Sequence, residues 1–189
     1  MAKEEKDIVK LKEEYEKIRK KYSLPTFSEL NEDFSIEKIS DVETDILIRK
    51  VRNVVGDKLA NYMRFLENLI NPVNVPMFIF SITKLLTAED KKKLSDTYNE
   101  LTKLEIKFIQ TDLMFEEEKE AKFIIDGFKF WQTAKKEAFA IFEKVNKKWD
   151  DKSESNNNKG YFGWGLLLLL KDNKMERFIN IILMEKSWV

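Results

Sequence analysis

The chain has 189 residues, with 34 basic and 34 acidic side chains and neither cysteine nor histidine. The absence of cysteine excludes disulfides, thiolate nucleophiles and cysteine-ligated metal sites. The absence of histidine removes the most frequent general base near neutral pH. The balanced charge lacks the basic excess that proteins binding duplex nucleic acid usually carry, because phosphate neutralisation supplies most of their affinity.

The composition favours helices over strands. Fourteen phenylalanines and four tryptophans supply enough apolar surface for a folded core, whereas five glycines and three prolines are too few for the tight turns of an all-β protein. We therefore expect an all-α fold, an antiparallel helical bundle of four or more helices with a C-terminal helical or extended appendage. The length predicts one domain, which we place at residues 1–150.

Two helices are predicted before residue 40. In the first, over residues 3–22, apolar residues recur at alternating spacings of three and four, which indicates one narrow buried stripe: Ile8, Leu11, Tyr15, Ile18 and Tyr22. Pro25 stops this helix, because the residue before a proline disfavours the helical conformation. Thr26 or Ser28 then supplies the N-cap of a short helix.

A long helix is predicted to start at Ser40 or Asp41, either of which can serve as its N-cap. Its expected buried face consists of Leu47, Val51, Val54, Val55, Leu59, Tyr62, Leu66 and Leu69. Gly56 interrupts this face at a cost of about 1 kcal/mol relative to alanine. Gly56 either permits a close helix crossing, marks a kink or has no structural role, and we favour a packing role over a ligand role.

After a break at residues 71–76, a short apolar helix is predicted over residues 77–86. A further helix from residue 88 to about 115 is expected to bury Leu94, Tyr98, Leu101, Leu104, Phe108 and Leu113. The last long helix starts near residue 121 and is expected to bury Ile124, Phe128, Trp131, Ala138, Phe142, Val145 and Trp149. The acidic run at 116–118 either separates these two helices or lies within one bent helix over 88–149.

Three phenylalanines, Phe123, Phe130 and Phe139, lie off the stripe of the last long helix. They either pack against a second neighbouring helix or form an exposed patch. Residues 151–160 are polar and predict a linker, after which residues 161–189 form a hydrophobic C-terminal appendage with Trp164 and Trp188. We expect these five aromatic residues to contact a partner, because the apolar side chains exceed what one buried stripe per helix requires.

No pattern in the sequence indicates a catalytic residue, a cofactor-binding residue or a metal ligand, and no cofactor is expected. The acidic cluster of Glu116, Glu117, Glu118 and Glu120 lacks the alternating ligands and central glycine of an EF-hand, and we interpret it as a solvated turn. The glycines within 160–165 lack the lysine of a phosphate-binding loop and the spacing of a dinucleotide-binding motif. The chain is accordingly predicted not to be an enzyme.

The function that the sequence favours is a non-catalytic protein-interaction, scaffolding or regulatory module that binds a protein partner or self-associates. One alternative is a nucleic-acid- or ribosome-associated factor that binds through the lysine clusters at 91–93, 135–136 and 147–148. Another is a peripheral membrane protein, whose tail is too short for a transmembrane span but suits interfacial contact. The first ten residues lack the apolar run of a secretory signal, which predicts a cytoplasmic or otherwise intracellular location.

Overall fold

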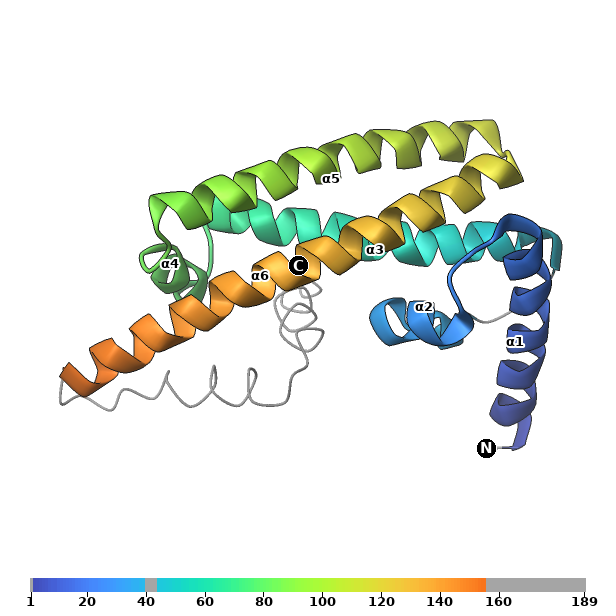
Figure 1. Ribbon diagram of the computed structural model, residues 1–189, viewed down its shortest axis with the longest axis horizontal. Coiled ribbons are helices and arrows are strands. Elements are labelled where there is room, and N and C mark those ends of the chain that lie inside the picture. The colour runs from blue at the N-terminus through green and yellow to red at the C-terminus, as the bar shows by residue number, and fades with distance from the viewer. Residues whose placement is uncertain (1, 40–43, 156–189) are drawn as a thin grey trace. The chain divides into compact units, whose positions relative to one another are not determined.

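The computed structural model describes residues 2–39 and 44–155, and every regular element in these ranges is a helix (Figure 1). The prediction of an all-α chain is confirmed for these residues. In chain order the elements are α1 (Ala2–Tyr22), α2 (Phe27–Phe34), the 3₁₀-helix η1 (Ile36–Lys38), α3 (Thr44–Ile70), α4 (Met77–Thr83), α5 (Ala88–Met114) and α6 (Glu117–Ser155).

The chain divides into two compact units, and the three longest helices each contribute to both. Unit 1 comprises Met1–Ala60 with Leu101–Thr133, and unit 2 comprises Asn61–Glu100 with the described residues from Ala134 onward. Helix α6 continues through residues 151–155, where the sequence predicts the start of a linker. The rest of that linker and the appendage at 161–189 lie outside the described residues.

In unit 1, Tyr15 holds the turn between α1 and α2. Its buried side chain donates a hydrogen bond to the Pro25 carbonyl at 2.7 Å, and its ring meets the edge of the Phe27 ring with centroids 5.6 Å apart. Burial raises the pKa of the Tyr15 hydroxyl, which therefore keeps the proton that it donates. Thr26 begins α2 with a capping box, in which its side chain and that of Glu29 each accept the other residue's backbone N–H. The predicted cap at Thr26 is confirmed.

A close approach between α3 and α5 in unit 1 centres on Gly56. A Cβ atom at this position would lie 2.7 Å from Cδ2 and 2.9 Å from Cζ of Phe108, well inside van der Waals contact. The Phe108 ring is held in place, because its centroid lies 5.3 Å from that of Phe123 and 4.7 Å from the Arg52 guanidinium. The expected packing role of Gly56 is confirmed, and the crossing that it permits offsets its low helix propensity.

Two separate helices span residues 88–149. Helix α5 ends before Phe115, which adopts a left-handed conformation with φ of 53°, a conformation that bulky residues rarely adopt. At the start of α6 the Glu116 carbonyl accepts the backbone N–H groups of Lys119 and Glu120, both at 3.0 Å. Because two residues separate the helices, the end of α5 and the start of α6 lie side by side in unit 1 (Figure 1).

Most positions of the predicted buried stripes are confirmed. The buried positions are Leu11, Tyr15, Ile18, Leu47, Val51, Val55, Leu59, Tyr62, Leu66, Leu69, Leu94, Leu101, Leu104, Ile124, Trp131, Ala138, Phe142 and Val145. Partly buried are Ile8, Tyr22, Val54, Tyr98, Phe108, Phe128 and Trp149. The prediction is wrong at Leu113, which is 76% exposed. In unit 1 α5 buries Leu104 and Thr111, and Leu113 lies almost opposite these residues around the helix.

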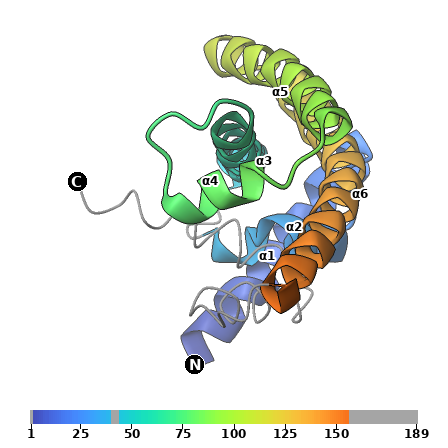
Figure 2. The ribbon, with the colours of Figure 1, turned by 90° about the vertical axis from the view of Figure 1, so that its left-hand side faces the viewer.

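Unit 2 contains the last turns of α3, the short α4, the start of α5 and the described end of α6. Loops on either side of α4 join it to α3 and to α5 (Figure 2). The core of this unit includes an aromatic cluster, in which the Phe65 centroid lies 6.3 Å from that of Tyr62 and 5.8 Å from that of Phe142. Aromatic burial of this kind contributes a large share of a small core's stability.

A buried carboxylate fixes the start of α5 in unit 2. Asp90 accepts hydrogen bonds from the backbone N–H and the hydroxyl of Thr87, at 3.1 and 2.7 Å, and from Lys144 on α6 at 3.3 Å. Burial alone would raise the pKa of Asp90, but these hydrogen bonds to its charged form outweigh burial and hold the pKa below its usual value. One turn further along α6, Lys148 donates to the Leu85 carbonyl at 2.9 Å.

Substituting Gly56→Ala is expected to destabilise the chain although alanine is the better helix former. Overpacking against the Phe108 ring costs about 1–3 kcal/mol, against a gain of about 1 kcal/mol from replacing a helical glycine. In a Phe108→Leu background the clash is relieved, so the same change becomes neutral or stabilising. Urea unfolding followed by circular dichroism measures both differences. An equal loss in the two backgrounds would contradict the close approach.

Replacing Asp90→Asn is expected to lower the free energy of unfolding at pH 7 by about 1–3 kcal/mol. Because the folded-state pKa of Asp90 is depressed, its contribution is complete above the unfolded-state pKa of about 3.9 and is lost as the pH falls through the folded-state value. The stability gap between wild type and variant therefore closes below about pH 4. Asp96→Asn, on the exposed side of α5, is the matched control. A gap that persists unchanged to pH 2 would refute the role assigned to Asp90.

Candidate functional site

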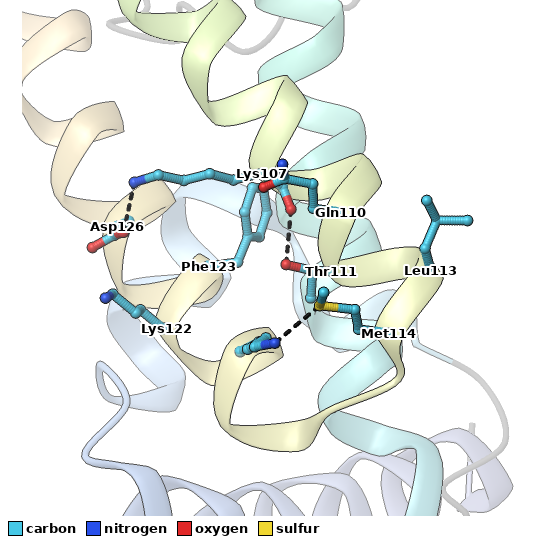
Figure 3. Close-up of a pocket in the computed structure, with 9 residues that line it drawn as sticks. Lys107, Gln110, Thr111, Leu113, Met114, Lys122, Phe123 and Asp126 are labelled. Atoms are coloured by element: carbon cyan, nitrogen blue, oxygen red, sulfur yellow. Dashed lines mark hydrogen bonds and ion pairs between the residues drawn. The ribbon is translucent and has the colours of Figure 1, made fainter.

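A groove of about 400 Å³ lies in unit 1 between the last turns of α5 and the first turns of α6 (Figure 3). Both helices line it, α5 through Lys107, Gln110, Thr111, Leu113 and Met114 and α6 through Lys119, Lys122, Phe123 and Asp126. The lining combines three apolar side chains with three lysines and one aspartate. The groove is therefore amphipathic and carries more positive than negative charge.

Phe123 forms the buried part of the groove. It is 3% exposed, and its ring lies between the two helices (Figure 3). Leu113 and Met114 are each more than half exposed, and Leu113 projects outward from α5 (Figure 3). Apolar surface thus continues from the groove onto the outside of the helix.

Three of the exposed apolar residues of α5, Ile106, Ile109 and Leu113, together form what we call the outer face. Each side chain is more than half exposed. The three residues occupy positions i, i+3 and i+7, which lie on one side of a helix. Phe115, also more than half exposed, follows directly after α5. Isolated exposed apolar residues are normal, but a contiguous row at helical spacing is typical of a contact surface.

The lysines that line the groove differ in their partners. Lys107 reaches from α5 to the Asp126 carboxylate on α6 at 3.3 Å (Figure 3). Lys119 pairs with the Glu116 carboxylate at 3.0 Å. Lys122 is exposed and has no ion pair or hydrogen bond with any described residue. The ammonium group of Lys122 is therefore available to an acidic partner.

A buried cation on α3 fixes the rotation of α5. Arg52 is fully buried, and its Nη2 atom donates to the Asp112 carboxylate at 2.7 Å. Its Nε and Nη1 atoms have no hydrogen-bond partner among the described residues. A buried guanidinium requires a counter-charge, so this pair holds the Asp112 side of α5 toward α3. The outer face is consequently left to solvent.

A second arginine of α3 reaches the turn between α5 and α6. Arg49 donates to the buried Glu120 carboxylate at 3.2 Å, and its guanidinium lies 4.3 Å from the Phe115 ring centroid. Cations over aromatic rings contribute about 0.5–1 kcal/mol at exposed sites. Arg49 therefore joins α3 to both sides of the turn that closes one end of the groove.

The first turn of α6 is also bound to α1. Glu117 accepts hydrogen bonds from the Tyr22 hydroxyl and from Lys21, the latter at 2.9 Å. These two donors hold the pKa of Glu117 below its usual value. A carboxylate at a helix N-terminus additionally interacts favourably with the helix dipole. Together with Arg49, these contacts position the helix end that carries Lys119 and Lys122.

The acidic cluster at the start of α6 is distributed among separate cations. Glu116 pairs with Lys119, Glu117 with Lys21, and Glu120 with Arg49. The interpretation as a solvated turn is wrong for Glu120, which is buried against α3. Within residues 2–39 and 44–155, no group of acidic side chains is arranged to hold a metal ion.

The structure describes three of the five aromatic residues expected to contact a partner, Phe123, Phe130 and Phe139. Phe123 packs against Phe108, which is one of the two predicted alternatives, and it also lines the groove. Phe130 is partly buried in unit 1, whereas Phe139 is 40% exposed in unit 2. Trp164 and Trp188 lie outside the described residues.

Sequence reasoning missed the outer face, although a signal for it was present. Ile106 and Ile109 lie off the predicted stripe of this helix, as Phe130 and Phe139 do on the next. Leu113 was assigned to the buried stripe although it stands five residues after Phe108, a spacing that does not return to the same side of a helix.

Lysines of the predicted clusters also make contacts within the chain. Lys93 pairs with Glu89 at 2.8 Å in the first turns of α5, and Lys148 donates to the Leu85 carbonyl. These contacts give both lysines a structural use in unit 2.

No protein-family model, curated protein or solved structure matches this chain. In the described part of the chain, no helix combines the length and the hydrophobicity that crossing a membrane requires. The function is therefore inferred from the groove and the outer face themselves.

Replacing Asp112→Ala is expected to cost about 1–3 kcal/mol, because it leaves the buried Arg52 guanidinium without its counter-charge. Arg52→Met should cost less, since it fills a similar volume without a buried charge, and Asp112→Ala should be nearly neutral in that background. Asp126→Ala, which breaks an exposed pair with Lys107, is the control and should cost under about 1 kcal/mol. Urea unfolding measures all four variants. Equal costs for the Asp112 and Asp126 variants would contradict the proposed role of Arg52.

Proposed function

We propose that the chain is a non-catalytic protein-interaction module with a scaffolding or regulatory role, and that it contacts its partner through the outer face of α5 and the adjoining groove. The observation that carries this proposal is the row of Ile106, Ile109 and Leu113, exposed at helical spacing on a helix whose opposite side is buried. Removing apolar surface from water gains about 25 cal/mol per Å² and is the main driving force of protein association.

The surroundings of this row support the proposal. Protein interfaces typically have an apolar centre and a polar rim. Here the apolar centre is formed by the outer face together with Met114 of the groove. The polar rim on the groove side consists of Lys107, Lys119 and Lys122. The ion pair of the buried Arg52 with Asp112 and the crossing at Gly56 supply a preorganised support, which lowers the cost of ordering a surface on binding.

We further propose that the helices form an antiparallel bundle of four or more helices. The two-residue connection between α5 and α6 supports this arrangement, because short connections join antiparallel neighbours in helical bundles. The ring contact between Phe108 of α5 and Phe123 of α6 agrees with it. A packed bundle would provide the rigid scaffold that a specific contact surface needs.

The aromatic residues identified from the sequence give a second set of proposed contacts. Phe139 is the most exposed of those that the structure describes, at 40%, and Phe130 is partly exposed. Trp164 and Trp188 in the C-terminal segment complete the set. Phe123 contributes differently, as the buried wall of the groove.

Ile109→Asp combined with Leu113→Asp is expected to abolish partner binding and leave the fold intact. Both side chains are exposed, so the unbound chain tolerates the change, whereas a carboxylate within an apolar contact carries a large desolvation cost. Affinity isolation of the intact chain from its native cells, followed by mass spectrometry, compares wild type, this double variant and Val73→Asp. Val73 is an exposed apolar residue of unit 2 and serves as the matched control.

The proposal is supported by a protein that co-purifies in stoichiometric amount with wild type and with Val73→Asp but not with the double variant. A dimer of wild type that dissociates in the double variant, measured by sedimentation velocity, identifies the partner as a second copy of the chain. If the same proteins co-purify in equal amounts with all three chains, the outer face is excluded as a contact surface. Nucleic acid kept by all three chains favours the alternative of binding through the lysine clusters.

A further inference from the structure

We propose that the partner element for this surface is an amphipathic helix with one acidic edge, laid along α5 so that its apolar side chains cover Ile109 and Leu113 and its carboxylates face the groove lysines. This inference rests on the proposed function and specifies the chemistry of the partner. It follows from the shape of the surface and from the different charges on its two flanks.

The surface is elongated along the helix axis. The outer face extends from Ile106 to Leu113, seven residues apart, which corresponds to about 10 Å at the rise of an α-helix. The groove of about 400 Å³ runs beside it and shares Leu113 with it. A helix that presents apolar residues at i, i+3 and i+7 matches such a strip in length and spacing. A small ligand that filled the groove would leave Ile106 and Ile109 exposed.

Charge distinguishes the two flanks of the outer face. On the groove side the lining contains three lysines, of which Lys107 pairs with Asp126 and Lys119 with Glu116. Of these lysines, Lys122 has no partner among the described residues, so its charge is uncompensated.

The opposite flank of α5 carries two carboxylates, those of Glu105 and Asp112, and the second is already bound to Arg52. A partner helix therefore gains from acidic side chains on the edge that faces α6 and would be repelled by them on the other edge. This asymmetry also sets the direction in which the partner's acidic edge points.

The same features disfavour a membrane as the occupant. Glu118, an exposed carboxylate with no ion pair to any described residue, lies close after Phe115 at the end of the apolar row, where it would repel anionic headgroups. A concave groove also accommodates the side chains of a peptide segment better than it fits a flat lipid surface. The partner is accordingly assigned as a protein helix.

The test is a selection of random 16-residue peptides displayed on phage against the intact, immobilised chain. Peptides that also bind the Ile109→Asp, Leu113→Asp chain are removed. The expected survivors carry apolar residues at i, i+3 or i+4, and i+7, with Asp or Glu concentrated on one edge. Synthetic copies should gain helicity on binding, measured by circular dichroism.

Charge reversal in the chain tests the acidic edge directly. Lys119→Glu combined with Lys122→Glu should weaken binding of the selected peptide about tenfold, as expected for two rim contacts of under 1 kcal/mol each. Added salt should weaken binding to wild type but not to this variant, because the reversed charges repel the peptide and salt screens that repulsion. Lys91→Glu combined with Lys92→Glu, exposed on α5 in unit 2, is the matched control and should bind as wild type does. Fluorescence anisotropy of the labelled peptide measures all three affinities.

The outcomes separate this inference from the function on which it rests. Survivors that are neutral or basic, or a charge-reversed chain that binds as tightly as wild type, overturn the acidic edge and leave the interaction surface standing. Survivors that bind without becoming helical overturn the helical form of the partner. A selection in which no peptide distinguishes wild type from the Ile109→Asp, Leu113→Asp chain overturns both proposals.

Discussion

The contact between Gly56 and the Phe108 ring is the constraint on which the arrangement of unit 1 depends. The Phe108 ring occupies the space that a side chain at position 56 would fill, and it also packs against Arg52 and Phe123. This contact fixes how α5 is rotated about its own axis. The pair between Arg52 and Asp112 enforces the same rotation by charge. With the rotation fixed, the residues almost opposite Leu104 and Thr111 face solvent, and these are the residues of the outer face.

Two features of unit 1 reduce its stability. Exposed apolar residues forgo the gain from burial, and the buried guanidinium of Arg52 leaves two nitrogen atoms without a hydrogen bond to any described residue. Proteins that depart from local rules of stability tend to do so at functional sites. Both features involve the same half of α5. The exposed apolar residues form its outer face, and the buried Arg52 orients that face through its ion pair with Asp112. This coincidence connects the packing of unit 1 to the proposed interaction surface.

The sequence predicted the helical class and most of the buried stripes, because residues such as Leu47, Val51 and Leu101 recur at the period that one packed side of a helix requires. It did not predict positions that depend on a second neighbour. Phe123 is buried although it lies off the stripe, since α6 packs against α5 through this side chain. The break after α5 lacks the glycine that usually marks a left-handed residue, which is why the sequence is compatible both with one bent helix and with two helices. Nothing in residue type predicts that Arg52 is buried.

Cysteine labelling tests most directly whether the outer face is exposed in the isolated chain. The sequence contains no cysteine, so single substitutions report accessibility without background. At a protein concentration low enough to keep the chain monomeric, Ile106→Cys, Ile109→Cys and Leu113→Cys should react with a maleimide at nearly the rate of the unfolded chain. Leu104→Cys and Thr111→Cys, on the buried side of α5, should react much more slowly. Fast labelling of the first three and slow labelling of the last two is the predicted result; equal rates, or protection of the first three in the monomer, would contradict the account.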